Sequence, residues 1–213
     1  RGKPQPKFKT IQPAIPILAA ILNECGDEST LVDACWALSY LSDGSDDQIQ
    51  CVIDLNIIPV LIKMLTCEKV VFIVPALRTL GNIVSGNDKQ TQTVIDHNVV
   101  PAVLPLLRHP KKNIRKESCW MLSNIAAGNM EQVTMLVNSP DLIPLVLAQL
   151  DASTEWDVRK EATWVISNIA CSGSKHNIMK MIEYGAISPL CELLEVAEVR
   201  VLQIALEALE HIL

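Results

Sequence analysis

The chain has 213 residues and a formal net charge of −6, which argues against a nucleic-acid-binding surface because phosphate contacts need clustered Lys and Arg. Hydrophobic residues make up 49% and aromatic residues 4% of the chain, so the apolar residues are mainly Leu, Ile, Val and Ala, which favours packed helices over a β-sandwich. The longest mainly apolar stretches, such as 57–65, are well short of the roughly 20 residues that cross a bilayer, so we predict no membrane span and no secretory signal.

A proline near the start of an apolar run recurs along the chain. The runs AIPILAAIL, IIPVLIKML, VVPAVLPLL and LIPLVLAQL place Pro16, Pro59, Pro101 and Pro144 at intervals of 42 or 43 residues. A fifth run, AISPLCELL, carries its proline one position late, at Pro189. Proline is tolerated in the first turn of a helix, where its missing N–H costs nothing. Each run is therefore predicted to begin a helix.

A longer helical segment after each run carries a second marker, an aromatic or basic residue followed four positions later by a polar one. This marker appears as CWALSY, ALRTLGN, CWMLSN and TWVISN, and as LEALEH in the fifth copy. Its leading positions are Trp36, Arg78, Trp120, Trp164 and Glu207. A third marker is a glycine just beyond this segment, where we expect a left-handed residue to end the helix. These glycines are Gly44, Gly86, Gly128 and Gly173.

The three markers share one phase and predict a repeat of about 42 residues. Each repeat has a short first helix, a second helix and a longer third helix, expected at 88–97, 99–107 and 113–127 in the third copy. A unit this small cannot bury its own apolar faces, so neighbouring repeats must stack on one another. The chain is therefore predicted to be an all-α solenoid forming a single domain over 1–213. Its five repeats are expected at about 7–43, 44–86, 87–128, 129–173 and 174–213.

The third helices are predicted to present two faces. Leu122, Ile125 and Ala126 have the spacing of a face that packs into the stack. Trp120 and Asn124 are four residues apart and share a different face. The equivalent pairs are Trp164 with Asn168, Trp36 with Tyr40, and Arg78 with Asn82, and Glu117 and Glu161 add carboxylates three residues before a Trp. A lone Trp is more often a core residue, but a core does not require Trp and Asn at the same position in successive repeats.

These repeated residues are suited to an extended basic peptide. Stacked helices lie about 8–10 Å apart and an extended peptide advances about 3.3–3.6 Å per residue, so a row of third helices could read alternate side chains. Neighbouring indoles would form slots for Lys or Arg, with cation–π attraction of about 0.5–2 kcal/mol. The Asn amides could bind the peptide backbone, and Glu117 and Glu161 could neutralise the basic heads. Trp156 is out of register with these residues and is predicted to be an ordinary core or surface residue.

In order along the chain, the motifs WALSYLSDG, ALRTLGNIVSGNDKQTQ, NIRKESCWMLSNIAAG and RKEATWVISNIA resemble those of the importin-α (karyopherin-α) family. The resemblance implies a right-handed armadillo-repeat α-solenoid. It also implies a nuclear import adaptor that binds the Lys/Arg-rich nuclear localisation signals of cargo proteins. In that family, two groups of Trp and Asn rungs form a major and a minor site, separated by repeats in which the pattern is broken.

Here the pattern is broken at Tyr40 and Arg78, which suggests that the chain runs from about the family's fifth repeat to its ninth and contains the minor site. The site residues that this resemblance implies are Trp120, Trp164, Asn82, Asn124, Asn168, Val84, Thr91, Ser123, Glu117 and Glu161, with Arg78, Trp36 and Tyr40 beside them. Glu207 and His211 replace Trp and Asn in the last copy, so that rung is not expected to bind peptide in the same way.

The resemblance also implies partners beyond the cargo. Importin-β is expected to bind the full-length protein through a basic N-terminal segment with no counterpart here, and an export factor through C-terminal repeats that this chain truncates. The chain begins with RGKPQPKFKT, expected to be a loop between repeats, and ends inside a third helix without a polar capping repeat. It is therefore expected to be a fragment of a longer array. The family shuttles between cytoplasm and nucleus.

Two other functions fit the sequence less well. A β-catenin-like armadillo scaffold for acidic partners would present rows of Lys and Arg on the third helices, whereas this chain offers Trp, Asn and Glu. An enzyme is not expected, because there is no nucleotide-binding glycine loop, no His–Glu metal pair and no Cys with an evident His partner. The seven cysteines form no CxxC pair, so no metal, cofactor or disulfide is expected, and Cys35 and Cys119 are predicted to be buried thiols in a reducing compartment.

Overall fold

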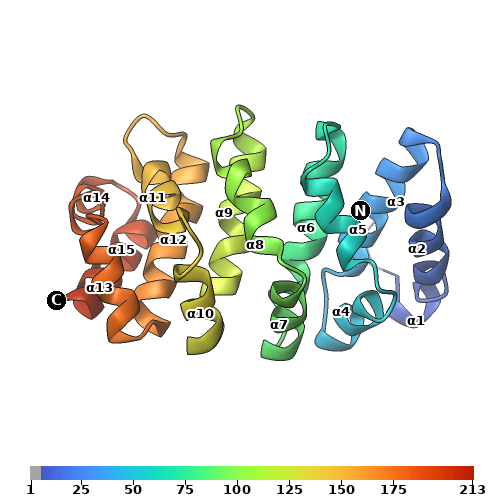
Figure 1. Cartoon of the computed structure of the whole chain (residues 1–213), viewed down its shortest axis with the longest axis horizontal. Helices are drawn as coiled ribbons and strands as arrows, with labels where there is room; N and C mark the ends of the chain where they lie inside the picture. The colour runs from blue at the N-terminus through green and yellow to red at the C-terminus, as the bar shows by residue number, and fades with distance from the viewer. Residues whose placement is uncertain (1–5) are drawn as a thin grey trace. The chain divides into compact units, whose positions relative to one another are not determined.

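The computed structural model describes residues 6–213, and every regular element in that range is helical (Figure 1). The all-α prediction is therefore confirmed. The chain divides into two compact units, Arg1–His97 and Asn98–Leu213. The helices of the first unit are α1 (Phe8–Ile11), α2 (Ala14–Glu24), α3 (Glu28–Leu41), α4 (Asp46–Ile53), α5 (Ile58–Leu65), η1 (Val70–Phe72), α6 (Ile73–Ile83) and α7 (Asp88–Asp96).

The second unit repeats the same succession of a short, a middle and a long helix. Its helices are α8 (Val99–Val103), η2 (Leu104–Arg108), α9 (Lys112–Ala126), α10 (Met130–Val137), α11 (Leu142–Leu147), η3 (Ala148–Leu150), α12 (Trp156–Ser172), α13 (Lys175–Glu183), α14 (Ile187–Glu192), η4 (Leu193–Glu195) and α15 (Val199–Ile212). The long third helices are α3, α6, α9, α12 and α15.

The repeated prolines lie in the first turns of α2, α5, α8, α11 and α14, as predicted. One expected helix, 99–107, is divided into α8 and the 3₁₀ segment η2. A second proline, Pro105, lies at the start of η2 and has no N–H to continue the α-helical bonding. At the other end of the chain, residues 1–5 of the expected N-terminal loop lie outside the described residues, and Phe8–Ile11 form the helical turn α1 where a loop was expected.

The glycines after the third helices have a different role from the one predicted. The residues with positive φ within 6–213 are Asn56, Asn98, Asp141 and Gly185, all in the turns before second helices, so the left-handed prediction for the repeated glycines is wrong. Each repeated glycine instead precedes the N-cap of a first helix. In α7 the Asn87 side chain accepts from the backbone N–H of Gln90, and the Gln90 side chain accepts from the N–H of Asn87. A Cβ at Gly86 would overlap this Gln90 side chain.

The third helices close the core of each unit. In the first unit α6 packs against α3, and in the second unit α12 packs against both α9 and α15. Leu122, Ile125 and Ala126 of α9 are fully buried, which confirms the predicted packing face. Cys35 and Cys119 are also buried as predicted, and burial raises the pKa of the Cys35 thiol to about 12. The third helices therefore seal the stack with one face and leave residues of another face partly exposed.

Candidate functional site

Two predicted rungs lie on adjacent packed helices of the second unit. Trp120 and Asn124 lie one helical turn apart on α9, and Trp164 and Asn168 lie one turn apart on α12. All four side chains are partly exposed, neither sealed in the core nor fully in solvent. The repetition of an indole and an amide on neighbouring helices makes this the candidate peptide-binding surface.

The two carboxylates beside these rungs differ in their environment. Glu161 is partly exposed, and its pKa is raised mainly by desolvation and also by the nearby Glu117, while Lys116 acts in the opposite direction. Glu117 is only 6% exposed, which differs from the expectation of two open carboxylates. Its position on α9 packs its side chain inward. Glu161 is therefore the carboxylate that a ligand can reach.

The Asn side chains also tie neighbouring repeats together, which sequence reasoning did not foresee. The Asn168 Nδ2 group donates to the backbone carbonyl of Ser123 at 2.9 Å, joining α12 to the end of α9. In the first unit, Asn82 Nδ2 donates in the same way to the carbonyl of Ser39 at 2.8 Å. The Ser123 carbonyl also accepts from the backbone N–H of Ala127, and the Ser39 carbonyl also accepts from the Ser42 hydroxyl, so each Asn adds a second donor to a carbonyl near a helix end. Asn168 therefore has a structural contact with the preceding repeat in addition to its predicted role toward a ligand.

Replacing Asn168 with Ala should lower the free energy of unfolding by about 0.5–1.5 kcal/mol, because the variant removes one hydrogen bond between repeats while the Ser123 carbonyl keeps the Ala127 N–H. Asn168→Asp should cost at least as much, since a carboxylate cannot donate to that carbonyl. Chemical denaturation followed by circular dichroism would measure this loss. Asn23→Ala is the control, because the Asn23 side chain donates to Ala19 within its own helix. Equal losses in the two Ala variants would contradict the inter-repeat role.

The other predicted site residues of the second and first units lie mostly below the surface. Ser123 is 5% exposed and its hydroxyl donates to the Trp120 carbonyl at 2.8 Å. Val84 and Thr91 are 2% and 3% exposed, and the Thr91 hydroxyl donates to the Val84 carbonyl at 3.1 Å. Such side chains support the helices and offer little surface to a ligand. Their direct contact with a peptide stays a prediction.

The remaining predicted residues lie on the third helices of the first unit. Trp36 and Tyr40 stack on each other on α3, with ring centroids 6.1 Å apart and an interplanar angle of 25°. Trp36 is partly exposed and Tyr40 is exposed. On α6, Arg78 is partly exposed and Asn82 is 7% exposed. The α3 pair therefore offers a stacked aromatic surface, whereas Asn82 serves the inter-repeat bond described above.

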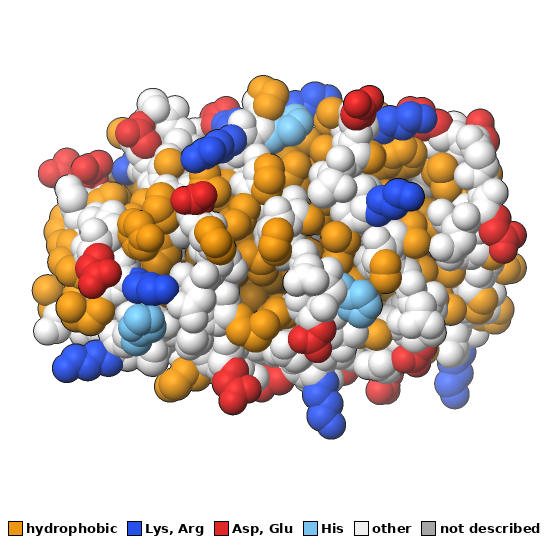
Figure 2. Space-filling view, in the orientation of Figure 1, with side chains coloured by type: hydrophobic (Ala, Val, Ile, Leu, Met, Phe, Trp, Pro, Cys, Tyr) orange, Lys and Arg blue, Asp and Glu red, His pale blue; other side chains and the backbone are white. Residues whose placement is uncertain are grey.

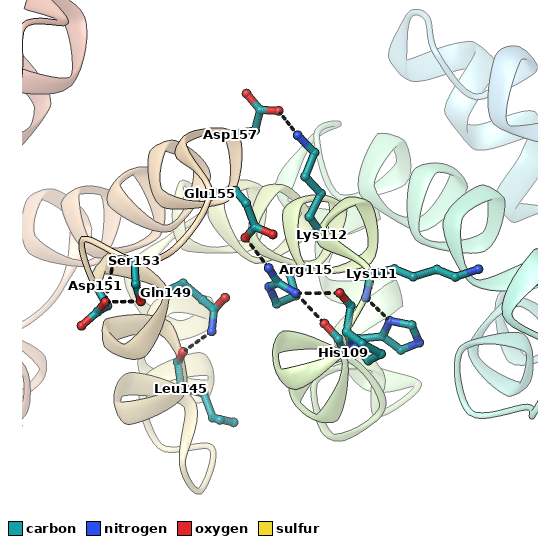
Figure 3. Close-up of polar contacts among 11 residues, drawn as sticks. His109, Lys111, Lys112, Arg115, Leu145, Gln149, Asp151, Ser153, Glu155 and Asp157 are labelled. Atoms are coloured by element: carbon teal, nitrogen blue, oxygen red, sulfur yellow. Dashed lines mark hydrogen bonds and ion pairs between the residues drawn. The ribbon is translucent and has the colours of Figure 1, made fainter.

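Ion pairs join the N-terminal turns of the third helices in the second unit (Figure 3). Lys112 of α9 pairs with Asp157 of α12 at 3.1 Å, and Arg115 pairs with Glu155 just before α12. The Arg115 guanidinium holds the pKa of Glu155 below its usual value. The exposed Lys112–Asp157 pair contributes about 0–1 kcal/mol, whereas the Arg115 side chain of the second pair is largely covered.

The same end of α12 also contacts the fifth repeat. Lys160 Nζ pairs with Glu198 at 2.8 Å, and the Trp156 indole N–H donates to the same carboxylate at 2.7 Å. These bonds lower the pKa of Glu198. Trp156, which was out of register in the sequence, is therefore a half-buried residue that binds a neighbouring repeat.

The fifth rung differs from the others, as the sequence indicated. Glu207 and His211 lie on exposed positions of α15, and His211 Nδ1 lies 2.8 Å from the Glu207 carbonyl. The fold also brings Cys171 Sγ to 3.8 Å from His211 Nδ1, a pair that sequence spacing did not suggest. Burial raises the pKa of the Cys171 thiol, and the nearby Glu207 carboxylate adds to this, so the site disfavours the reactive thiolate.

Sequence reasoning missed one residue at the site. The guanidinium of Arg200, on α15, lies over the Trp164 ring at 5.6 Å from its centroid. Arg200 precedes Glu207 by seven residues, which is two helical turns and places both on one side of α15. That spacing was the signal in the sequence, because Glu207 marks the fifth rung.

Other site classes find little support in the described residues. On the face shown in Figure 2, acidic and basic side chains are interspersed among apolar ones. Within residues 6–213 no group of three or more His, Cys, Asp or Glu side chains is placed to hold a metal ion. In the same range no single helix is long and apolar enough to cross a membrane. Two pairs of consecutive helices, each pair sharply bent at its break, would be long and apolar enough by length and composition alone. They are Asp46–Ile53 with Ile58–Leu65 and Met130–Val137 with Leu142–Leu150.

Solved structures similar to this chain are armadillo repeat proteins. A designed armadillo repeat protein matches with a TM-score of 0.92 and 27% identity, over 97% of this chain and 86% of that chain. Another designed armadillo repeat protein, solved in complex with peptide (KR)4, matches with a TM-score of 0.89 and 32% identity, over 97% of this chain and 85% of that chain. The prediction of an armadillo solenoid is confirmed by these likenesses.

The curated relatives are importin α subunits. Importin subunit alpha-1b of Oryza sativa subsp. japonica is 47% identical over the whole of this chain, which covers 40% of that protein. Importin subunit alpha-4 of Arabidopsis thaliana is 46% identical, again over the whole chain and 39% of that protein. The armadillo/beta-catenin-like repeat model matches residues 3–43, 45–85, 87–127 and 174–213. The chain therefore belongs to the armadillo/beta-catenin-like repeat family, and its homologues along its full length are importin α subunits.

Proposed function

We propose that this chain is part of a nuclear import adaptor and binds the basic nuclear localisation signal of cargo proteins, in an extended conformation, on the rungs of α9 and α12. In the importin-α family this surface would be the minor, C-terminal site. The observation that carries the proposal is the pair of equivalent, partly exposed rungs, Trp120 with Asn124 and Trp164 with Asn168, on packed helices. The designed relative with bound peptide (KR)4 supports a basic ligand for this fold.

Each residue type has a separate role in this proposal. The indoles of Trp120 and Trp164 flank the aliphatic stems of Lys or Arg and attract their cationic heads. Asn168 has one N–H and its carbonyl oxygen left after its bond to Ser123, so its amide can still bind a peptide group. Glu161 supplies the accessible negative charge. Together these groups select a cation while holding the peptide main chain.

The activity and partners of the whole protein extend beyond this chain, which spans about 40% of the importin α relatives that it matches throughout. We propose that the full-length protein shuttles between cytoplasm and nucleus. Its contacts with importin-β and with an export factor would use other segments, as the family resemblance implies. In this proposal, importin-β and the export factor do not bind to the rungs of α9 and α12.

Titration calorimetry with three peptides of equal length would test the proposal. The Lys/Arg-rich peptide should bind, with affinity that falls as salt rises, because charge attraction between exposed groups is screened. Its all-Ala and Glu-rich counterparts should not bind. Preference for the Glu-rich peptide would favour the alternative of a β-catenin-like scaffold and contradict the import proposal.

A further inference from the structure

The Trp164 indole already has a cation beside it in the structure. The Arg200 guanidinium lies 5.6 Å from the centroid of the Trp164 ring, within the range of a cation–π contact. Arg200 is exposed, and among residues 6–213 no carboxylate forms an ion pair with it. Its neighbour Glu198 is hydrogen-bonded to Lys160 and Trp156, and its charge attracts Arg200 without a direct ion pair. The Trp164 indole is therefore the side chain over which this guanidinium lies.

The order of the helices shows where this contact lies in the row of rungs. Within the second unit α12 packs against α9 and also against α15, which carries Arg200. Trp120 belongs to α9, and the position equivalent to it on α15 is Glu207. A cation bound between α9 and α12 would contact an indole from each helix. Helix α15 carries no Trp, so a cation between the rungs of α12 and α15 would meet the Trp164 indole without a second rung indole, and Arg200 lies over that ring.

We propose that Arg200 fills the last cation slot of the row and thereby fixes where a bound basic peptide must end. This inference rests on the proposed function of the rungs. The chain supplies its own guanidinium at the Trp164 face toward α15, so a Lys or Arg side chain of the ligand is excluded from that face. Arg200 is thus a specificity-determining residue that limits the number of basic residues read, without lining the slot between Trp120 and Trp164.

The contact is weak enough to be tested by substitution. A cation–π contact at an exposed site is equivalent to about a two- to fivefold change in affinity. Adjacent rungs about 8–10 Å apart correspond to about three residues of extended peptide. A ligand Lys placed three residues beyond a minimal basic core should therefore reach the slot once Arg200 is removed. Because Arg200 is exposed, Arg200→Ala should keep the helical content and melting temperature of the unaltered chain.

The experiment is calorimetry on the full 213-residue chain and its Arg200→Ala and Arg200→Lys variants. The peptides are a minimal Lys-Arg core and the same core extended by three residues, at either end, with Lys or Ala as the last residue. For one of the two ends, Arg200→Ala should bind the Lys-extended peptide about two- to fivefold more tightly than the unaltered chain does. It should show no such gain for the core or the Ala-extended peptide. Arg200→Lys should behave like the unaltered chain, because it restores a cation.

A control variant separates the slot from overall charge. Lys175→Ala removes one exposed positive charge from α13 in the same unit. An equal gain in Lys175→Ala, or an equal gain of Arg200→Ala for all the peptides, would overturn the inference and leave the binding proposal intact. Identical affinities in the unaltered chain and Arg200→Ala would overturn it as well. If neither protein bound any basic peptide, both proposals would fall, whereas binding of the Lys-extended peptide only by Arg200→Ala would support the inference.

Discussion

Trp164→Ala should weaken binding of a Lys/Arg-rich peptide by about 2 kcal/mol or more, as truncation of an interface Trp commonly does. The loss should depend on the ligand side chain, since the indole contributes contact with an aliphatic stem and attraction for its cation. A matched peptide with Ala in the Trp164 slot should lose much less. Calorimetry with the two peptides would measure the difference between these losses.

Trp156→Phe is the matched control for Trp164→Ala. Trp156 lies on the same helix, but it precedes Trp164 by eight residues, and its N–H binds Glu198 at the helix start. The control should bind both peptides like the unaltered chain. Equal losses for the Lys and Ala peptides in Trp164→Ala, or melting of its helices, would return Trp164 to a structural role.

Glu161→Arg should reduce affinity for the same peptide by roughly 1.5–3 kcal/mol or more at low salt, the range for a hydrogen bond to a charged group. The variant replaces the accessible carboxylate of the site with a like charge for the ligand. The loss should shrink as salt is added. Glu183→Arg, which reverses an exposed charge at the end of α13, is the control and should change the affinity little. Similar losses in both variants would indicate a general charge effect.

The pH dependence gives an independent check on Glu161. Desolvation raises its pKa, so as pH falls its carboxylate is protonated at a higher pH than an ordinary Glu. The charged form attracts a basic peptide, so this contribution is present above the raised pKa and is lost as pH falls through it. Glu161→Gln should remove that part of the pH dependence. Glu117→Arg is a poor test, because a guanidinium in place of a buried side chain would disturb folding.

Much of the fold could be predicted because each repeat carries several sequence markers in the same register. The proline of each second helix and the leading residue of each third helix recur at nearly constant intervals. Together they predicted the positions of the helices and the packing face of Leu122, Ile125 and Ala126. Local chemistry was harder to predict. The sequence does not show whether Gly86 adopts a positive φ or makes room for a neighbouring side chain. The Asn87 and Gln90 pair three residues apart was the clue to the second explanation.

The candidate site could be predicted by periodicity and only partly by composition. Periodicity placed Trp120 and Trp164 on equivalent faces, but it could not show that Glu117 is buried while Glu161 is partly exposed. It also could not show the bond from Asn168 to the preceding repeat, since that depends on helix packing between repeats. Contacts of Arg200 were missed because arginine does not recur at that position in the other third helices. The repeat boundaries and the peptide-binding roles stay predictions.

The most direct test of the central claim is nuclear magnetic resonance of the four tryptophan indole N–H groups during titration with a Lys/Arg-rich peptide. Each tryptophan is assigned by substitution with Phe, so the signals report separately on the rungs and on Trp156. We expect saturable shifts of the Trp120 and Trp164 signals with one common affinity, equal to that from calorimetry, while the Trp156 signal stays unchanged. Binding by calorimetry with unchanged Trp120 and Trp164 signals would contradict it.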